Sequence, residues 1–223
     1  MAILAADPGR RGLSALPTDV EQRITDGLAQ LGVAAGPDPA AALLRYLTLL
    51  QQWNRAYNLT SVTGLDDMAV RHILDSATAR PYLSGAAILD AGTGAGLPGI
   101  PLALLEPSRR FTLLDSVGKK VRFLHQAVAE LGLVNVALAQ ARLEDWQPQE
   151  LFDTVICRAF GTLAEFVAAC GRLVTPAGRL VAMKGRHPAD EVCAVPGPWC
   201  VVALERVTVP GLDAERHIVV LEH

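Results

Sequence analysis

The stretch from Ile88 to Ala103, I-L-D-A-G-T-G-A-G-L-P-G-I-P-L-A, decides the fold predicted for this chain. Apolar residues surround Asp90, glycines follow at positions 92, 94 and 96, and Pro98 precedes a second apolar run. This order is typical of a buried strand, a glycine turn and the first turn of a helix. Glycines suit a nucleotide-type pocket because a turn without Cβ atoms adopts positive φ and lets a ligand lie against bare backbone amides. A tight turn without a ligand is the alternative for the glycines taken alone.

Composition limits the classes of protein to consider. The 223 residues, 51% of them hydrophobic, are enough for one large core, so we expect one domain with a small extension. Because the formal net charge is −3, contact with nucleic acid requires a local basic patch. The four cysteines form no C-x-x-C pair and have no histidine at metal-ligand spacing, which indicates neither a metal site nor disulfides. No apolar run approaches the roughly 20 residues of a membrane span, so we expect a cytoplasmic protein that does not bind membranes.

The pattern of apolar residues divides the chain into three parts. Residues 1–16 show no periodicity and are predicted to form a flexible tail. Residues 17–84 repeat apolar positions at helical spacing and are predicted to form a helical subdomain. From residue 85 to residue 223 strands alternate with helices, which predicts a doubly wound, mostly parallel α/β sheet of the Rossmann-like kind.

The elements are expected at defined positions. In the helical part, Thr18 begins a capping box and Asp38-Pro39 begins a second helix. The expected helices are residues 18–31, 39–53, 66–82, 119–131 and 163–173. The expected strands are residues 86–91, 110–114, 134–139, 153–158, 179–183, 200–209 and 216–221, the last two forming an antiparallel pair.

Two carboxylates indicate the kind of ligand. In open parallel sheets the ligand binds at the carboxyl ends of the strands, where the strand order reverses. Asp115 ends the second strand about 20 positions after Gly92, the offset at which an acidic residue binds ribose hydroxyls. Capping of the next helix is the alternative role. Asp90 precedes the glycine turn, where a carboxylate repels a pyrophosphate and attracts ammonium and sulfonium groups. This charge favours S-adenosylmethionine over NAD.

Several segments of the chain form a recognisable set together with L-P-G-I-P-L after the glycines. They are L-L-D-S-V-G-K-K-V-R-F-L, A-R-L-E-D-W, I-C-R-A-F, M-K-G and E-R-H-I-V-V, with W-N-R-A-Y-N-L-T-S and R-H-I-L-D-S in the amino-terminal helices. This set resembles one family, the bacterial ribosomal RNA methyltransferases called RsmG or GidB. The resemblance runs from about Leu43 to Leu221, and L-P-G-I-P-L is its most specific part. Small departures are Ala95, where many members have proline, and Cys157, where serine is common.

The resemblance implies a class I S-adenosylmethionine-dependent methyltransferase with a seven-stranded sheet. It further implies transfer of a methyl group to N7 of a guanine in 16S ribosomal RNA of the small subunit, with no DNA partner. By similarity the cofactor contacts fall on Gly92 and Leu97 in the glycine turn, Asp115 at the ribose, Leu143 and Glu144 at the adenine edge, and Arg158 near the methionine end. The charge of Asp90 and the position of Gly94 in the turn add these two residues. The basic residues implied at the RNA are Arg142, Arg158, Lys184 and Arg216.

The absence of an obvious general base agrees with this chemistry, because guanine N7 has a free lone pair and needs positioning only. Two other functions stay open from the sequence. One is a nicotinamide-dependent dehydrogenase, which Asp90 and the L-P-G-I-P-L segment oppose. The other is a catalytically silent RNA-binding or ribosome-assembly factor that retains the cofactor pocket.

Other side chains have two interpretations each. His72 and Asp75 form either an acid–base pair or, as we favour, a hydrogen bond on a helix surface. Trp53 and Tyr57 stack on bases or, as we favour, pack in the core. Phe160 either lines the guanine pocket or packs on the sheet. The basic cluster of Lys119, Lys120 and Arg122 either contacts phosphates or forms a solvated face. We expect Cys157 and Cys170 to be small apolar residues that fill the core.

Overall fold

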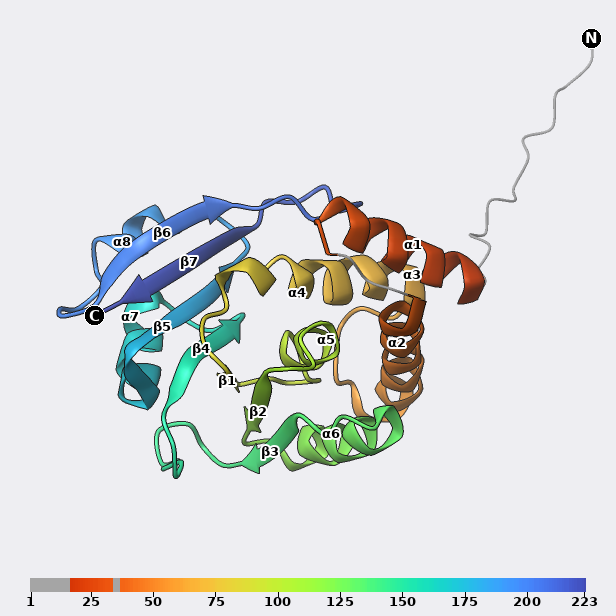
Figure 1. The fold of residues 1–223 in the computed structure, drawn as a ribbon, viewed down its shortest axis with the longest axis horizontal. Helices are drawn as coiled ribbons and strands as arrows, with labels where there is room; N and C mark the ends of the chain where they lie inside the picture. The colour runs from red at the N-terminus through yellow and green to blue at the C-terminus, as the bar shows by residue number, and fades with distance from the viewer. Residues whose placement is uncertain (1–16, 34–36) are drawn as a thin grey trace, which may run out of the picture.

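The computed structural model describes residues 17–33 and 37–223, which form an α/β fold around one seven-stranded sheet (Figure 1). The strand order is β3-β2-β1-β4-β5-β7-β6. Strands β1 to β5 run parallel, and β7 is antiparallel to both of its neighbours, so the predicted mostly parallel sheet with a final antiparallel pair is confirmed. Because β1 lies between β2 and β4, the strand order reverses there, where the sequence places the glycine turn. The tail predicted for residues 1–16 lies outside the described residues.

The seven strands agree with their predicted positions except at some ends. Strand β5 begins five residues earlier than predicted, because Pro176 and Gly178 are accommodated by a register shift opposite β4 instead of breaking the strand. Strand β6 ends three residues earlier than predicted, before the turn at Pro210 and Gly211. The strands are β1 Ala87–Ala91, β2 Arg110–Asp115, β3 Val136–Gln140, β4 Phe152–Arg158, β5 Val174–Lys184, β6 Cys200–Arg206 and β7 His217–Glu222.

The helices also begin near their predicted positions. Helix α1 begins one residue before Thr18, so Thr18 lies inside the helix and does not cap it, and α2 begins at Pro37 instead of after Asp38. Proline is compatible with the first helical turn because its missing N–H has no partner there. The helices are α1 Pro17–Gln30, α2 Pro37–Tyr57, α3 Leu65–Met68, α4 Asp75–Ala77, α5 Gly99–Leu105, α6 Gly118–Leu131, α7 Leu163–Cys170 and α8 Ala189–Val192.

The third predicted helix contains a π-helical segment. Residues 69–74 form this segment between α3 and α4, and a short 3-10 turn follows at Arg80–Tyr82. The i→i+5 hydrogen bonds of a π-helix widen it and change the direction of the side chains that follow, and such segments are frequent at functional sites. His72 and Asp75 lie in and directly after this segment, and both are buried.

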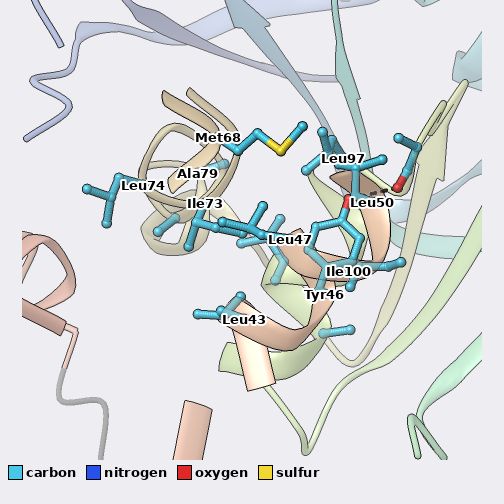
Figure 2. Packing of buried hydrophobic residues seen from close by; sticks show 14 of the residues in the cluster. Leu43, Tyr46, Leu47, Leu50, Met68, Ile73, Leu74, Ala79, Leu97 and Ile100 are labelled. Atoms are coloured by element: carbon cyan, nitrogen blue, oxygen red, sulfur yellow. Dashed lines mark hydrogen bonds between the residues drawn. The ribbon is translucent and has the colours of Figure 1, made fainter. Parts of the chain in front are cut away.

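Two layers of helices cover one face of the sheet. Helices α5 and α6 and the segment from α3 to α4 lie on the sheet side, and α1 and α2 pack outside them (Figure 1). Figure 2 shows side chains of α2, among them Leu43 and Leu47, packed with Ile73, Leu97 and Ile100. Burial of each large apolar side chain of this kind stabilises the folded state by about 1.5–3 kcal/mol. The cluster continues onto the sheet, so the amino-terminal helices share one core with it; α7 covers the other face.

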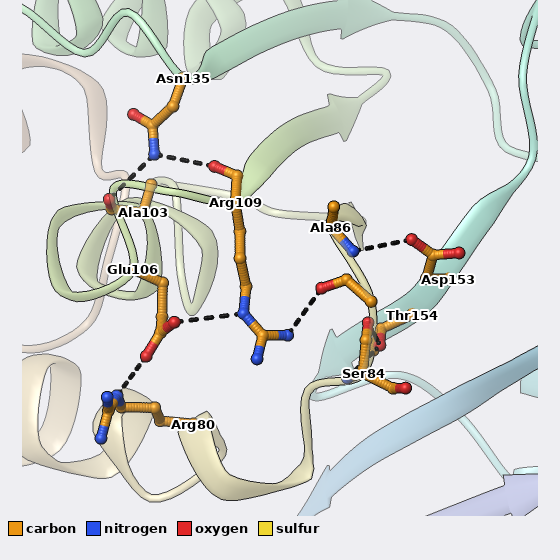
Figure 3. A network of polar contacts seen from close by, with 10 residues as sticks. Arg80, Ser84, Ala86, Ala103, Glu106, Arg109, Asn135, Asp153 and Thr154 are labelled. Atoms are coloured by element: carbon orange, nitrogen blue, oxygen red, sulfur yellow. Dashed lines mark hydrogen bonds and ion pairs between the residues drawn. The ribbon is translucent and has the colours of Figure 1, made fainter.

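A polar network lies at the amino-terminal ends of the central strands, at the opposite end of β1 from the glycine turn (Figure 3). Glu106, at the end of α5, binds both Arg80 and Arg109, the second at 3.1 Å. Arg109 also donates to the carbonyl oxygen of Gly85, and Asp153 accepts from the amide of Ala86 at 2.8 Å. No helix within the described parts of the chain is long and apolar enough to span a membrane.

Candidate active site

Asp90, in the buried strand β1, has one carboxylate oxygen without a partner. Its side chain is 0% exposed. Oδ2 accepts hydrogen bonds from the hydroxyl of Thr93 (2.5 Å) and the amide of Gly99 (2.8 Å). Oδ1 is buried and accepts no hydrogen bond from any described residue. Burial raises the pKa of Asp90 to about 6, against the lowering effect of these two donors. A buried oxygen of this kind fits a ligand that brings a donor or a positive charge.

The glycines of the turn divide into two pairs. Gly92 and Gly94 have φ of +71° and +63°, and a Cβ added to either would meet no atom closer than 3.9 Å, so both face open space. Gly96 and Gly99 instead permit close packing, because an added Cβ would lie 2.5 Å from Ile100 or 2.2 Å from Leu113. The open pair is the one predicted to bind cofactor, and it forms a cradle next to Asp90.

The backbone amides of this turn are mostly used within the protein. The amides of Gly92, Thr93, Gly94, Gly96 and Leu97 all donate to protein acceptors. The expectation that bare amides face a ligand is therefore wrong for these five, because the turn needs them to hold its own shape. The side chain of Leu97 is buried in the core, so the open cradle and the oxygen of Asp90 are what the turn offers to a ligand.

Asp115, at the end of β2, connects the glycine turn to α6. Its Oδ1 accepts from the amide of Val117 at 2.8 Å, and its Oδ2 accepts from the amide of Gly94 at 2.9 Å and faces Lys120 at 3.4 Å. Asp115 therefore fixes the turn before α6 but does not cap the helix, which has no side-chain capping hydrogen bond at its N-cap residue Val117. Each carboxylate oxygen has two lone pairs, which leaves capacity for ribose hydroxyls as well.

Tyr46 is a residue of this site that sequence reasoning missed. It lies on α2, is fully buried, and its hydroxyl donates to the carbonyl oxygen of Ala95 in the glycine turn at 2.7 Å (Figure 2). Burial raises the pKa of Tyr46 far above its ordinary value, so the hydroxyl stays a donor. The only sign of this role in the sequence is that Tyr46 places a hydroxyl group on a helix face whose neighbouring positions, Leu43 and Leu47, are apolar.

A cavity of about 330 Å³ lies at the ends of β4 and β5. The residue between its basic groups is Asp75, which is 3% exposed and accepts from Arg158 at 3.4 Å and from Arg216 at 2.9 Å. The structure thus brings together three of the four predicted basic residues. The polar side chains that line this cavity include Arg71, His72, Asp75, Arg158, Lys184 and Arg216.

Two of the predicted basic residues differ from expectation. Arg142 is exposed on the loop after β3 and does not line the cavity. Lys184 lines it, but its ammonium group donates to Glu191 of α8 at 2.7 Å and to the carbonyl oxygen of Gly161 at 2.6 Å. Glu191, which sequence reasoning missed, therefore neutralises this lysine.

His72 and Asp75 follow neither of their two interpretations. Both are buried by the π-helical segment, so they do not lie on a helix surface. The Nε2 of His72 lies 2.9 Å from the hydroxyl of Thr60, and Asp75 pairs with the two arginines. Burial, and then the charge of Arg158, lower the pKa of His72 to about 4, so the ring is neutral at pH 7.

A family model described as rRNA small subunit methyltransferase G matches residues 40–219. The chain belongs to this family. A protein of Nitrosococcus oceani named ribosomal RNA small subunit methyltransferase G is 47% identical over 201 residues, covering 90% of this chain and 94% of its own length. A protein of the same name from Xanthomonas campestris is 46% identical over 208 residues, covering 93% of this chain and 97% of its own length.

Solved structures share the fold of this rRNA small subunit methyltransferase G family member at low sequence identity. Magnesium protoporphyrin IX methyltransferase from Synechocystis, solved with bound S-adenosylmethionine, has a TM-score of 0.58 at 16% identity and covers 80% of this chain and 97% of its own. Coclaurine N-methyltransferase has a TM-score of 0.55 at 14% identity and covers 87% of this chain and 74% of its own. These matches show the class I methyltransferase fold.

Residues 141–146, the A-R-L-E-D-W segment of this rRNA small subunit methyltransferase G family member, are held in place by an arginine that sequence reasoning missed. Arg172, directly after α7, donates to the carbonyl oxygens of Leu143 (2.8 Å), Glu144 (3.2 Å) and Trp146 (2.8 Å). Leu143 is half-buried and the side chain of Glu144 is exposed. The two residues implied at the adenine edge thus lie on a loop whose backbone is fixed.

The turn after Arg158 contains Ala159 in the left-handed region, with φ of +57°. A residue with a Cβ is uncommon there, and such strain clusters at functional sites. Phe160 follows, and its ring centroid lies 5.4 Å from that of Phe166 on α7. Phe160 therefore packs on the sheet and does not line the arginine cavity.

Most of the remaining side chains whose roles the sequence left undecided contact other protein groups. Trp53 contacts Phe123 with ring centroids 5.7 Å apart, which confirms core packing for Trp53. Core packing is wrong for Tyr57, which is 37% exposed at the end of α2. Lys119 donates to the carbonyl oxygen of Tyr57 at 2.7 Å, and the guanidinium of Arg122 lies 5.9 Å from the centre of the Tyr57 ring. Two of the three basic residues at the start of α6 therefore hold the end of α2, and Lys120 faces Asp115.

Cys157 and Cys170 are buried free thiols. Burial raises the pKa of Cys157 well above its ordinary value and that of Cys170 to about 12. The thiolate is the reactive form of cysteine, so both side chains are inert fillers, as expected. No group of three or more potential metal ligands occurs among residues 17–33 and 37–223.

Proposed function

We propose that this protein transfers the methyl group of S-adenosylmethionine to N7 of a guanine in the 16S RNA of the small ribosomal subunit, in the cytoplasm. Family membership supports ribosomal RNA as the substrate. The observation that carries the proposal is the unpaired, buried Oδ1 of Asp90 beside the open cradle of Gly92 and Gly94. An arginine-lined cavity at the ends of the next strands supplies a place for RNA.

The residues present fit this cofactor. Asp90 would accept from its ammonium group, Asp115 would accept from the ribose hydroxyls, and the fixed loop at Leu143 and Glu144 would hold the adenine. Arg158 holds either the cofactor carboxylate or the substrate. When bound, the cofactor supplies an electrophilic methyl carbon on a positively charged sulfur.

The arginine cavity suits an acceptor atom that carries no proton. Guanine N7 has a free lone pair and carries no proton, so methylation there would need no residue that accepts a proton. His72 is neutral with its Nε2 at Thr60, and Asp75 is paired with two arginines, so neither is poised as a general base. Alignment of acceptor and donor therefore supplies most of the acceleration.

Four basic residues are assigned to the RNA. Arg158 and Arg216 lie in the cavity, Lys184 lies on its wall, and Arg142 extends this charge from the loop after β3. Because methylation at N7 places positive charge on the base, these groups act on phosphates or on guanine O6 and not over the ring face. The helical part, residues 17–84, shapes the RNA surface next to the sheet part, residues 85–223, and residues 1–16 form a tail.

Transfer of tritium from labelled cofactor to small subunits isolated from cells that lack this modification tests the proposal. We expect one methyl group per subunit, and mass mapping of the RNA fragments to place it on N7 of a guanine. Asp90→Asn and Arg158→Ala should each lower kcat/KM without a large fall in melting temperature. Tight binding of the RNA without transfer would instead identify a catalytically silent assembly factor.

A further inference from the structure

One buried carboxylate holds two arginines that come from distant parts of the chain. Asp75 lies at the start of α4, directly after the π-helical segment, Arg158 ends β4, and Arg216 precedes β7. The Oδ1 of Asp75 accepts from Nε of Arg216, and its Oδ2 faces Nη1 of Arg158. Both arginine side chains are 22% exposed, at the cavity, whereas Asp75 is buried behind them.

The arginines keep donors that the protein does not use. Nη1 of Arg158 also donates to the carbonyl oxygen of Arg71, and Nη1 of Arg216 donates to the carbonyl oxygen of Glu215. Within the described residues, the Nη2 groups of both arginines and Nε of Arg158 have no protein acceptor. The guanidinium groups of Arg158 and Arg216 and the carboxylate of Asp75 together carry one positive charge. Lys184 adds none because Glu191 neutralises it, and Arg71, which also lines the cavity, adds a second positive charge.

The lining of the arginine cavity favours an anion of the RNA over the carboxylate of the cofactor as the ligand of this pair. None of the residues lining the arginine cavity belongs to the glycine turn, which forms the cofactor cradle. Planar guanidinium groups with free N–H donors match the oxygens of a phosphate. The net positive charge of this cavity favours a phosphodiester, which is negatively charged.

We propose that Asp75 is a positioning residue, which orients Arg158 and Arg216 so that their free N–H groups together bind one phosphodiester of the substrate RNA. The inference rests on the proposed function. Without the carboxylate, two guanidinium groups would repel each other in a cavity of low dielectric, and the pair would separate. Asp75 acts only through the arginines and does not touch the reacting atoms.

Asp75→Asn tests the positioning role because it keeps the shape of the side chain and removes its charge. We expect kcat/KM for small subunits to fall about a hundredfold, as for other misplaced binding groups. The Kd for S-adenosylmethionine should not change. The matched control is Glu106→Gln, because Glu106 also binds two arginines but lies at the amino-terminal ends of the central strands (Figure 3). This control should keep the wild-type kcat/KM even where both variants lower the melting temperature.

A double-mutant cycle shows whether the effect passes through the arginines. Arg216→Ala alone should lower kcat/KM, and it should reduce the dependence of RNA binding on salt by about one phosphate contact, roughly 0.7 in the slope of log K against log salt concentration. In the Asp75→Asn background Arg216→Ala should have little further effect on either quantity, because the pair is already misplaced.

Three results would overturn the inference: wild-type kcat/KM in Asp75→Asn, losses from Asp75→Asn and Arg216→Ala that multiply, or an equal loss of cofactor affinity and activity in Asp75→Asn, which would indicate a purely structural role. A wild-type protein that binds RNA but transfers no methyl group would instead contradict the proposed function. The salt dependence of RNA binding in the same four proteins would still test the role of Asp75.

Discussion

The hydroxyl of Tyr46 on α2 and the carbonyl oxygen of Ala95 in the glycine turn form a buried hydrogen bond of 2.7 Å. Tyr46→Phe keeps the ring in the core and leaves the carbonyl without this donor, which costs about 1–3 kcal/mol. We expect the Kd for S-adenosylmethionine, measured by calorimetry, to rise about tenfold, because the turn loses one of its supports. Tyr57→Phe, at the exposed end of the same helix, is the control. An unchanged Kd in Tyr46→Phe would show that the turn does not depend on α2.

Asp90→Asn should stabilise the protein in the absence of cofactor. The folded-state pKa of Asp90 is about 6, above its ordinary value of 3.8. Between these pH values the folded state binds the proton and the unfolded state does not, so stability falls as pH rises through this window. Above it, Asp90→Asn should raise the free energy of unfolding by up to about 3 kcal/mol, and the gain should disappear below about pH 4. Denaturation at pH 4 and pH 8 measures both values, and a variant less stable at pH 8 would contradict the argument.

His72 should make the protein sensitive to acid. Its pKa is about 4 in the folded state, below the ordinary value of 6.5. Below pH 6.5 the unfolded state takes up the proton first, so stability is complete above pH 6.5 and is lost as pH falls toward 4. His72→Gln should have a smaller difference in melting temperature between pH 7.5 and pH 5 than the wild type. An equal difference would place the acid sensitivity on other groups.

Cys157→Ala should retain catalytic activity. The thiol is buried and protonated, so we assign it packing and no chemistry. Loss of its sulfur should lower the free energy of unfolding by about 1 kcal/mol, as for other small deletions in a core. Treatment with a thiol reagent should also leave kcat of the wild type unchanged, since Cys157 and Cys170 are buried. Loss of methyl transfer by a stable Cys157→Ala variant would refute this assignment.

The sheet and the cofactor cradle could be predicted because their signals are local. Asp90, Gly92 and Gly94 lie within five positions, and the alternation of strands and helices fixes the edge of the sheet at which they lie. The same locality explains the errors at element ends. Pro176 and Gly178 are read as turn residues from the sequence alone, but their neighbours in β4 accommodate them in a strand.

The partners of the polar groups could not be predicted, because they come from distant segments. Asp75 lies 83 positions from Arg158 and 141 from Arg216, and only the folded sheet brings the three together. The π-helical segment, which buries His72 and Asp75, changes the helical period that sequence reasoning assumes. Tyr46 was missed because an aromatic residue on an apolar helix face is read as packing.

The core that α2 shares with the sheet limits how the amino-terminal helices can be altered. These helices cannot be exchanged as a unit, because Tyr46 and the apolar side chains that pack behind the glycine turn would be lost with them. Changes that leave the sheet intact are therefore confined to point substitutions on the outward sides of the helices.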